Sequence, residues 1–161
     1  MKAAGIIFII TSFSVFGFYI SQKQLSVLKG IKRAERFLKS VLICLNSEHM
    51  PIKEMLEYIA KISDDKTKRF VLCLEDYDLI NSLKTADICD FCPSNEAVDI
   101  ISEAFSILGK YSVDEQNIEL ENCIEKLKNV YSNTEETIKN KAAFSKISGI
   151  LCGFLAAVLL I

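Results

Sequence analysis

The chain ends on Ser148–Ile161, SGILCGFLAAVLLI, and this apolar stretch decides which kind of fold to expect. The charge-free run that contains it, Ile147 to Ile161, is 15 residues long and covers only about 22 Å as a helix, against a hydrocarbon core about 30 Å thick. A helix that begins near Ala142 covers 20 residues, about 30 Å, if the Lys146 ammonium reaches the headgroups. We therefore expect a C-terminal transmembrane helix over residues 142–161 rather than the last core helix of a soluble domain.

A second apolar run lies near the other end of the chain. Ala3 to Ile20 is 18 residues without a charge, about 27 Å of helix, and Lys2 precedes it. A cleaved signal peptide is the alternative interpretation of this run. It is the less favoured one, because the run is long and the segment FYIS (residues 18–21) lacks the small residues of a cleavage site. We expect an uncleaved transmembrane helix over residues 1–21.

Basic residues are concentrated on the inner sides of these two runs, in the segment 22–141 and at its end. Loops rich in Lys and Arg stay in the cytoplasm, so the middle segment is predicted to be cytoplasmic, with both termini across the membrane. The overall net charge of −2 argues against a nucleic-acid partner. The early basic cluster is better suited to the anionic headgroups of the bilayer. The residues concerned are Lys23, Lys29, Lys32, Arg33, Arg36 and Lys39 after the first run, and Lys128, Lys139, Lys141 and Lys146 before the second.

The middle segment shows helical periodicity and no sustained strand alternation, so the predicted fold class is all-α, a cytoplasmic helical bundle flanked by N- and C-terminal transmembrane helices. Apolar residues recur at helical spacing from Leu25 to Leu45, and this helix is expected to continue from the N-terminal one. Pro51 suits the first position of a second helix. Asp64 suits the N-cap of a third. Residues 78–93 are expected to form a short helix or a loop.

Two further helices are predicted after Pro93. Ser94 suits an N-cap, and Gly109 suits the end of the helix that follows it. Ser112 and Glu115 have the spacing of a capping box, in which each side chain satisfies a backbone N–H at the start of a helix. No Pro or Gly follows until Gly149, so one helix is expected from residue 112 to the end of the chain.

The one recognisable chemical motif is Cys89-Asp-Phe-Cys92. A C-x-x-C pair forms half of a zinc site or a redox dithiol. Zinc needs two further ligands, but the sequence offers no second pair and only one histidine, His49. We therefore favour cysteines that pack as small apolar residues, and we keep a membrane-bound redox or metal protein as the alternative. We expect no enzyme activity, no catalytic residue and no cofactor.

Two kinds of interaction site are predicted from composition. Gly149 and Gly153 form a G-x-x-x-G pair, in which small residues let membrane helices approach closely, and the first transmembrane helix is the expected partner. Acidic residues and one glutamine are expected to form solvated faces or a docking surface for a basic partner. These predicted docking residues are Glu75, Asp76, Asp78, Asp114, Glu115, Gln116 and Glu119.

The sequence resembles the stage III sporulation protein AB family along nearly its whole length. The resemblance rests on LGKYSVDEQ (residues 108–116), on FSKISGILCGFLAAVLLI (residues 144–161) and on RFLKSVLICLNSEHMPIKEMLEYIAK (residues 36–61). Leu108, Gly109 and the Asp114-Glu115-Gln116 cluster match the family's opening of the last cytoplasmic helix. Gly149 and Gly153 match its glycine-containing terminal anchor. The chain differs in its NSEH segment (residues 46–49) and in having no tryptophan around residues 80–92.

This resemblance implies a membrane component of the channel that joins mother cell and forespore, in the mother-cell membrane around the forespore. It also implies a cytoplasmic domain similar to that of the type II secretion inner-membrane platform protein. The expected partners are a secretion-type ATPase, other membrane subunits of the complex and the lipid bilayer. A homo-oligomer is compatible with the sequence.

Overall fold

The structure is a computed structural model that describes residues 2–48, 51–74 and 87–159. Its contacts divide the chain into two compact units. We call residues 1–28 together with 133–161 the stem pair, and residues 29–132 the bundle. In the described ranges every regular element is a helix, which confirms the all-α prediction.

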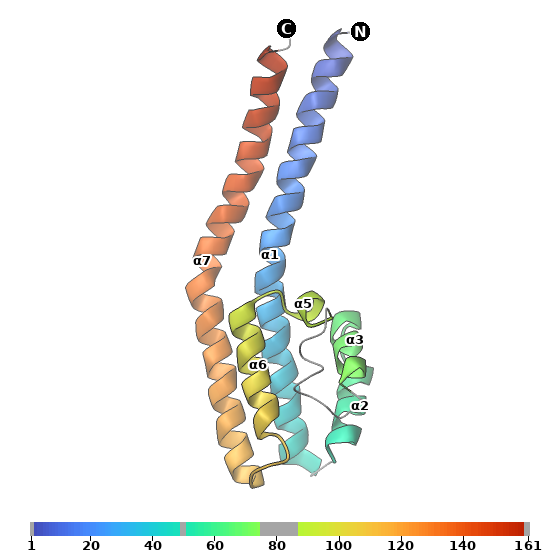
Figure 1. The fold of residues 1–161 in the computed structure, drawn as a ribbon, viewed down its shortest axis with the longest axis vertical. Coiled ribbons are helices and arrows are strands. Elements are labelled where there is room, and N and C mark those ends of the chain that lie inside the picture. The colour runs from blue at the N-terminus through green and yellow to red at the C-terminus, as the bar shows by residue number, and fades with distance from the viewer. Residues whose placement is uncertain (1, 49–50, 75–86, 160–161) are drawn as a thin grey trace. The chain divides into compact units, whose positions relative to one another are not determined.

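Two helices of 47 residues each contribute to both units (Figure 1). Helix α1 (Lys2–Glu48) joins the first apolar run to the first helix of the bundle, and α7 (Val113–Leu159) begins directly after Ser112, the first residue of the predicted capping box. Both continuous helices were expected from the sequence. The reason is local, because neither segment contains a proline that would interrupt the helical hydrogen bonds.

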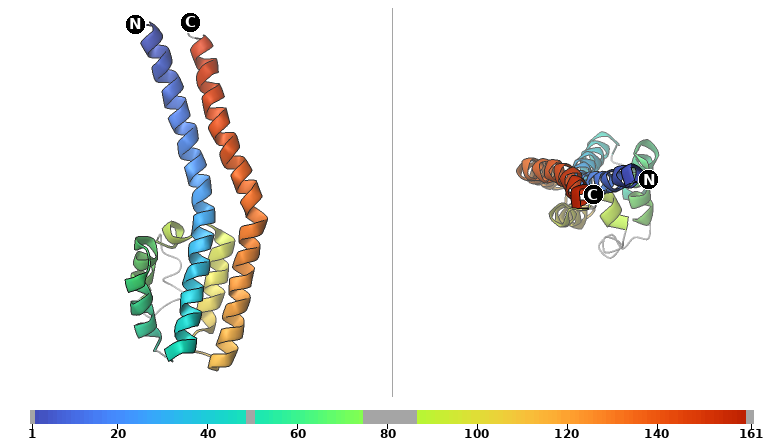
Figure 2. Two further views of the ribbon diagram at one scale, coloured as in Figure 1. Left: turned by 180° about the vertical axis from the view of Figure 1, so that it is seen from behind. Right: turned by 90° about the horizontal axis from the view of Figure 1, so that it is seen from above.

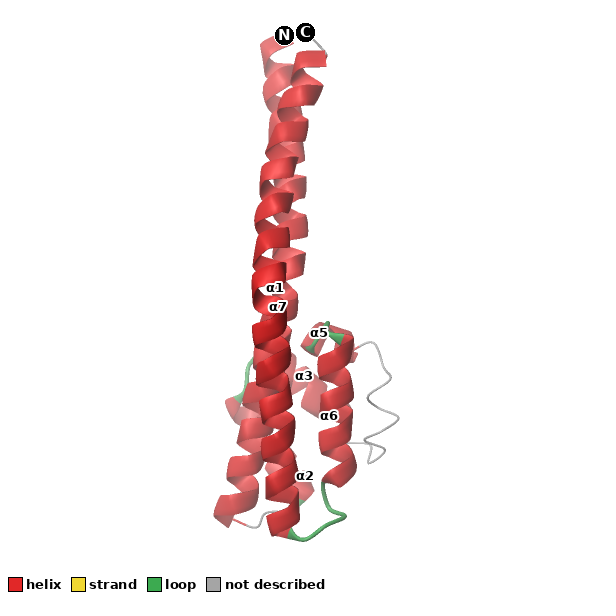
Figure 3. Cartoon of the chain, turned by 90° about the vertical axis from the view of Figure 1, so that its left-hand side faces the viewer, coloured by secondary structure: helices red, strands yellow, loops and turns green. Residues whose placement is uncertain are grey.

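Within the described residues, the bundle adds four shorter helices to its parts of α1 and α7. Figure 3 draws these elements in red, the colour of helices. Helix α7 and the pair α2–α3 lie on opposite sides of the bundle, with α1 and α6 between them (Figure 2). Helix α5 falls in the stretch where the sequence predicted a short helix or loop. The shorter helices are α2 (Ile52–Ile62), α3 (Asp65–Cys73), α5 (Asp87–Phe91) and α6 (Asn95–Ile107).

Four phenylalanines from four different helices form the centre of the bundle. Phe70 of α3 stacks on Phe91 of α5 with ring centroids 4.1 Å apart. Phe37 of α1 meets both rings edge-on, at 5.6 and 6.0 Å. Phe105 of α6 lies 5.8 Å from Phe37. Edge-to-face and stacked pairs of this kind contribute about 0.5–1.5 kcal/mol beyond their burial, so this cluster joins α1, α3, α5 and α6 into one core.

The predicted helix starts are confirmed, with one shift. The Asp64 side chain accepts a hydrogen bond from the Thr67 N–H, and the Ser94 side chain accepts one from the Ala97 N–H. Pro51 is the N-cap residue of α2 and not its first helical residue, because its ψ of 143° is extended. Its carbonyl accepts the first hydrogen bond of the helix from the Met55 N–H, at 3.1 Å. The fixed φ of proline is compatible with either position.

The stem pair exposes large apolar side chains along both of its helices. Phe8 and Phe144 are 74% and 72% exposed, and Val15, Leu155 and Val158 are exposed to a similar degree. Among the described residues, Val113–Val158 is the one helix long and apolar enough to cross a membrane, judged on length and composition. The first run includes Ala3, Ala4 and Ile6, whose side chains lie outside the described part of the chain. The transmembrane helix over residues 1–21 and the boundaries at 22–141 and 142–161 stay predictions.

Candidate functional site

The turn between α6 and α7 is closed by Gln116. Its side-chain oxygen accepts a hydrogen bond from the Gly109 N–H at 3.3 Å, and its side-chain nitrogen donates to the Tyr111 carbonyl at 2.6 Å. Gly109 has a φ of +78°, a conformation that side chains with a Cβ rarely adopt. Two of the family-like motifs thus meet in one turn, Leu108-Gly109 and Asp114-Glu115-Gln116. Gly109 permits the backbone conformation of the turn, and the buried Gln116 side chain forms hydrogen bonds to it.

The capping box next to this turn forms as the sequence predicted. The Glu115 carboxylate accepts hydrogen bonds from the Ser112 N–H at 3.1 Å and from the Ser112 hydroxyl at 3.0 Å. The Glu115 N–H donates to the Ser112 oxygen at 3.4 Å. Glu115 and Gln116 therefore make contacts within the chain, although both were predicted as docking residues.

The other predicted docking residues divide into exposed ones and ones that the structure leaves undescribed. Asp114 and Glu119 are exposed near the start of α7, where Glu121 and the apolar Ile118, 59% exposed, are exposed as well. Glu75, Asp76 and Asp78 lie outside the described residues. The first three turns of α7 thus present carboxylates around an uncovered isoleucine, a combination suited to a partner with both basic and apolar groups.

The inward position of Gln116 could have been read from its spacing. It precedes the fully buried Leu120, Cys123 and Leu127 by four, seven and eleven residues, which places it on the buried face of α7. A polar residue on an apolar stripe is normally bonded to something. Composition alone assigned it to the acidic surface because its neighbours in sequence are Asp114 and Glu115.

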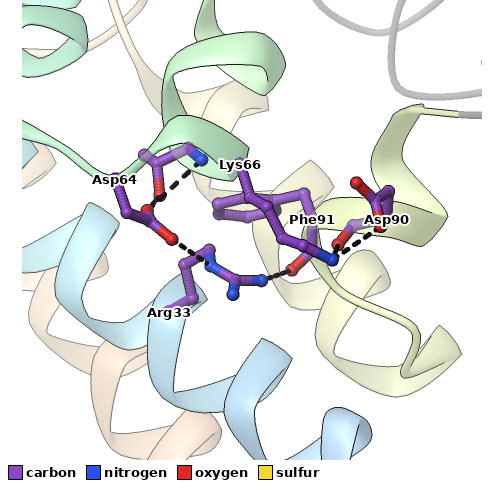
Figure 4. A network of polar contacts seen from close by, with 6 residues as sticks. Arg33, Asp64, Lys66, Asp90 and Phe91 are labelled. Carbon is purple, nitrogen blue, oxygen red and sulfur yellow. Dashed lines mark hydrogen bonds and ion pairs between the residues drawn. The ribbon is translucent and has the colours of Figure 1, made fainter. Parts of the chain in front are cut away.

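Arg33 of α1 connects three segments of the bundle (Figure 4). Its Nε donates to Asp64 Oδ2 at 2.9 Å, and its Nη1 donates to the Phe91 carbonyl at 2.7 Å. Asp64 also accepts a hydrogen bond from the Thr67 hydroxyl. Nearby, Lys66 pairs with Asp90 at 2.7 Å. These contacts tie the start of α3 and the end of α5 to α1.

The electrostatics of this network follow from its geometry. Partial burial alone would raise the pKa of Asp64, but the hydrogen bonds from Thr67 and Arg33 and the Arg33 charge outweigh it, so the pKa of this carboxyl lies below its ordinary value. The hydrogen bond from Lys66 likewise lowers the pKa of Asp90. Sequence reasoning missed the network, because Arg33 was counted only as one member of the basic cluster.

The stem pair is packed through glycines. A Cβ built on Gly149 would lie 2.9 Å from the Cα of Gly17 and 2.9 Å from the Phe13 carbonyl oxygen. A Cβ on Gly153 would lie 3.2 Å from the Cα of Ile10. Both glycines of the G-x-x-x-G pair therefore face the N-terminal helix. The separation at Gly149 is one that only a residue without a side chain allows, whereas at Gly153 a Cβ would require its neighbours to shift by a few tenths of an ångström.

A polar contact accompanies this glycine packing. The side-chain nitrogen of Gln24 lies 3.3 Å from the Ser145 hydroxyl oxygen, linking the two helices of the stem pair. Ser21, fully buried nearby in the sequence, has a hydroxyl without a hydrogen-bond partner in the described part of the chain. Apolar side chains give two membrane helices no hydrophobic driving force to associate, so a hydrogen bond between polar side chains helps to hold such helices together.

The cysteines offer no assembled site among the described residues. Cys92 is buried, and burial raises the pKa of its thiol despite a backbone hydrogen bond at Ser94 and the Arg33 charge. Burial and the neighbouring Glu103 raise the pKa of the Cys123 thiol to about 11. No group of three or more His, Cys, Asp or Glu that could hold a metal lies in the described ranges. The Cys89 side chain and His49 lie outside them, so the C-x-x-C alternative is not tested.

The chain is similar to a known protein family along almost its whole length. The family model of stage III sporulation protein AB matches residues 2–161. No curated protein and no solved structure matches the chain. The matched range contains the residues of the Gly109–Gln116 turn, of the Arg33 network and of the stem-pair glycines, and the match supports a role in sporulation. The chain belongs to the stage III sporulation protein AB family.

Proposed function

We propose that this protein is a membrane assembly protein of a secretion-like channel between mother cell and forespore, and that its bundle docks a secretion-type ATPase. The observation that carries the proposal is the family match over residues 2–161. The proposal includes a similarity between the bundle and the cytoplasmic domain of the type II secretion inner-membrane platform protein.

The membrane part of the proposal rests on the stem pair. Its exposed apolar side chains, such as Phe8, Phe144 and Leu155, would be uncovered in water but satisfied by lipid. Its glycine-mediated packing is of the kind that membrane helices use. With two membrane-spanning helices and the basic flanks inside, residues 22–141 would lie in the cytoplasm, where an ATPase has its nucleotide.

The docking part rests on the first turns of α7. Asp114 and Glu119 are exposed, and the Gln116 and Ser112–Glu115 contacts hold the backbone beside them in one conformation. A rigid surface loses little conformational entropy when a partner binds. Exposed Ile118 gives such a surface an apolar contact in addition to its charges.

The test is co-purification of the full chain, in detergent, with the secretion-type ATPase of the same sporulating cell. We expect the two proteins to elute together from a sizing column. The double variant Asp114→Lys, Glu119→Lys should weaken the complex at least tenfold, because like charges then face the basic surface of the partner. Its helicity should match that of the wild type.

A matched charge reversal controls for nonspecific effects. Glu57 of α2 and Asp99 of α6 are also exposed, and no ion pair involves them in the described structure. The variant Glu57→Lys, Asp99→Lys changes the net charge equally and should bind as the wild type does. Separate elution of the two wild-type proteins would refute ATPase docking. Equal weakening by both variants would refute the assignment to α7.

A further inference from the structure

A cleft of about 490 Å³ lies in the bundle between α1 and the junction of α2 with α3. One wall carries four cationic side chains, Lys29, Lys32, Arg33 and Arg36. Their spacing of three, four and seven residues places all four on one face of α1. The facing wall contributes Ser63 and Asp64 among others, so the described lining has one carboxylate against four cations.

The four cations differ in the groups that they contact. Arg33 is paired with Asp64, and the Lys32 ammonium lies 5.3 Å from the centre of the Tyr131 ring. Lys29 and Arg36 are exposed and take part in none of the ion pairs formed by the described residues. Like charges three, four or seven residues apart on a helix destabilise it slightly. The fold therefore places the positive charges of Lys29 and Arg36 in a concave site where no ion pair of the described residues balances them.

The chemistry of the lining selects the class of ligand. Guanidinium and ammonium groups both bind phosphate oxygens. Arg does so through two parallel hydrogen bonds, and Lys acts as a point charge. The Ser40 side chain also lines the cleft and can donate from its hydroxyl. Ile62, 60% exposed, adds an apolar edge. A phosphate attached to a small organic group satisfies each of these features.

We propose that this cleft binds a phosphate group, carried either by an anionic phospholipid headgroup or by a soluble phosphate. This site is separate from the acidic surface at the start of α7 and does not depend on ATPase docking. Lys29 follows the last residue of the first apolar run, Ile20, by nine residues. On the continuous helix α1 this is about 14 Å, close enough for Lys29, at the near end of the cleft, to approach anionic headgroups when that segment spans the bilayer.

The experiment uses the full chain in a zwitterionic detergent with two probes. Native mass spectrometry measures how many phosphatidylglycerol molecules remain bound to each chain, with phosphatidylcholine as the comparison lipid. Calorimetry measures the binding of inorganic phosphate. The variant Lys29→Gln, Arg36→Gln should bind the phosphate ligand on the order of tenfold more weakly, because each basic group near a phosphate contributes to the free energy of binding. Both side chains are exposed, so circular dichroism and sizing elution should be unchanged.

Two further variants make the test specific. Lys110→Gln, Lys128→Gln removes two exposed lysines that do not line the cleft and should leave binding within about twofold, because neither side chain contributes to the site. Asp64→Asn removes the one carboxylate of the described lining and leaves the Arg33 charge without a counter-charge, while asparagine caps α3 as well as aspartate does. This variant should bind phosphate severalfold more tightly.

The outcomes separate the sources of the phosphate. Binding of phosphatidylglycerol alone, with the expected dependence on the variants, assigns the cleft to a lipid headgroup. Binding of inorganic phosphate with the same dependence assigns it to a soluble phosphate. The proposal is overturned if neither probe binds or if Asp64→Asn does not strengthen binding. It is also overturned if Lys110→Gln, Lys128→Gln weakens binding as much as Lys29→Gln, Arg36→Gln does.

Discussion

Gly30 of α1 lies against Pro93, so that a Cβ built on the glycine would be 2.5 Å from the proline Cδ. The Cα of Cys92 would be 3.1 Å from the same Cβ. Helix α1 therefore approaches the backbone between α5 and α6 at a distance that only glycine permits. This approach also brings the Phe91 carbonyl to Arg33 and the Phe91 ring into the aromatic cluster.

Replacing Gly30 should therefore loosen the bundle. In Gly30→Val the clash is with a ring atom bonded to the backbone nitrogen, which cannot move aside alone, and the expected loss of unfolding free energy is about 2 kcal/mol or more. Hydrogen exchange of α6 amides, measured on the full chain, should become faster. Gly5→Val is the control, because a Cβ at Gly5 meets no atom within 4 Å. Unchanged exchange in Gly30→Val would contradict the close packing.

Removing the hydrogen bonds of Gln116 should open the turn between α6 and α7. Gln116→Leu keeps the size of the side chain but leaves the Gly109 N–H and the Tyr111 carbonyl without their partner, at a cost of about 1–3 kcal/mol. Trypsin should then cleave after Lys110, within this turn, about fivefold to a hundredfold faster. The exposed Glu121→Gln on the same helix should cleave at the wild-type rate. Equal rates in all three proteins would show that Gln116 does not stabilise the turn.

The ion pair between Arg33 and Asp64 predicts an acid-sensitive bundle. The pKa of Asp64 in the folded protein lies below its ordinary value of 3.8, so the carboxylate stabilises the fold fully above that pH. The stabilisation is lost as the pH falls through the folded value. Asp90, whose pKa is also lowered, contributes in the same direction. The wild-type unfolding temperature should therefore decrease below about pH 4.

The variant Asp64→Asn isolates this contribution. Its unfolding temperature should be lower than that of the wild type at neutral pH, and the difference should shrink as the pH falls below the ordinary pKa. Asp65→Asn, at the neighbouring exposed position in the first turn of α3, controls for the loss of one carboxylate. A difference between Asp64→Asn and wild type that is constant with pH would mean that the effect does not come from the charge of the carboxylate.

Enlarging Gly149 should separate the two helices of the stem pair. In Gly149→Leu the new side chain occupies the space of the Gly17 Cα and the Phe13 carbonyl. A photoreactive phenylalanine analogue at position 13 should cross-link residues 1–28 to residues 133–161 in the wild-type background, and the yield should fall severalfold in the variant. Gly5→Leu should leave the yield unchanged. A full yield in Gly149→Leu would mean that the helices tolerate a side chain at this contact.

The local features of the fold could be predicted from the sequence because their causes lie within a few residues. Apolar spacing and the absence of proline indicated the continuous helices α1 and α7. Asp64, Ser94 and the Ser112–Glu115 box indicated where helices start, since a capping side chain bonds to an N–H two or three residues away. The family resemblance likewise depended on linear motifs and was confirmed.

Contacts between distant residues were decided only by the tertiary structure. Arg33 meets Asp64 and Phe91 across 31 and 58 residues of chain, and nothing in the spacing of these residues indicates that they pair. The same holds for Gly30 against Pro93, for the phenylalanine cluster and for the basic cleft. The sequence by itself determined which segments are helices and which of their faces are apolar. How those faces pack sets which polar groups meet, because a side chain's partners depend on the helices brought beside it and not on its neighbours in the chain.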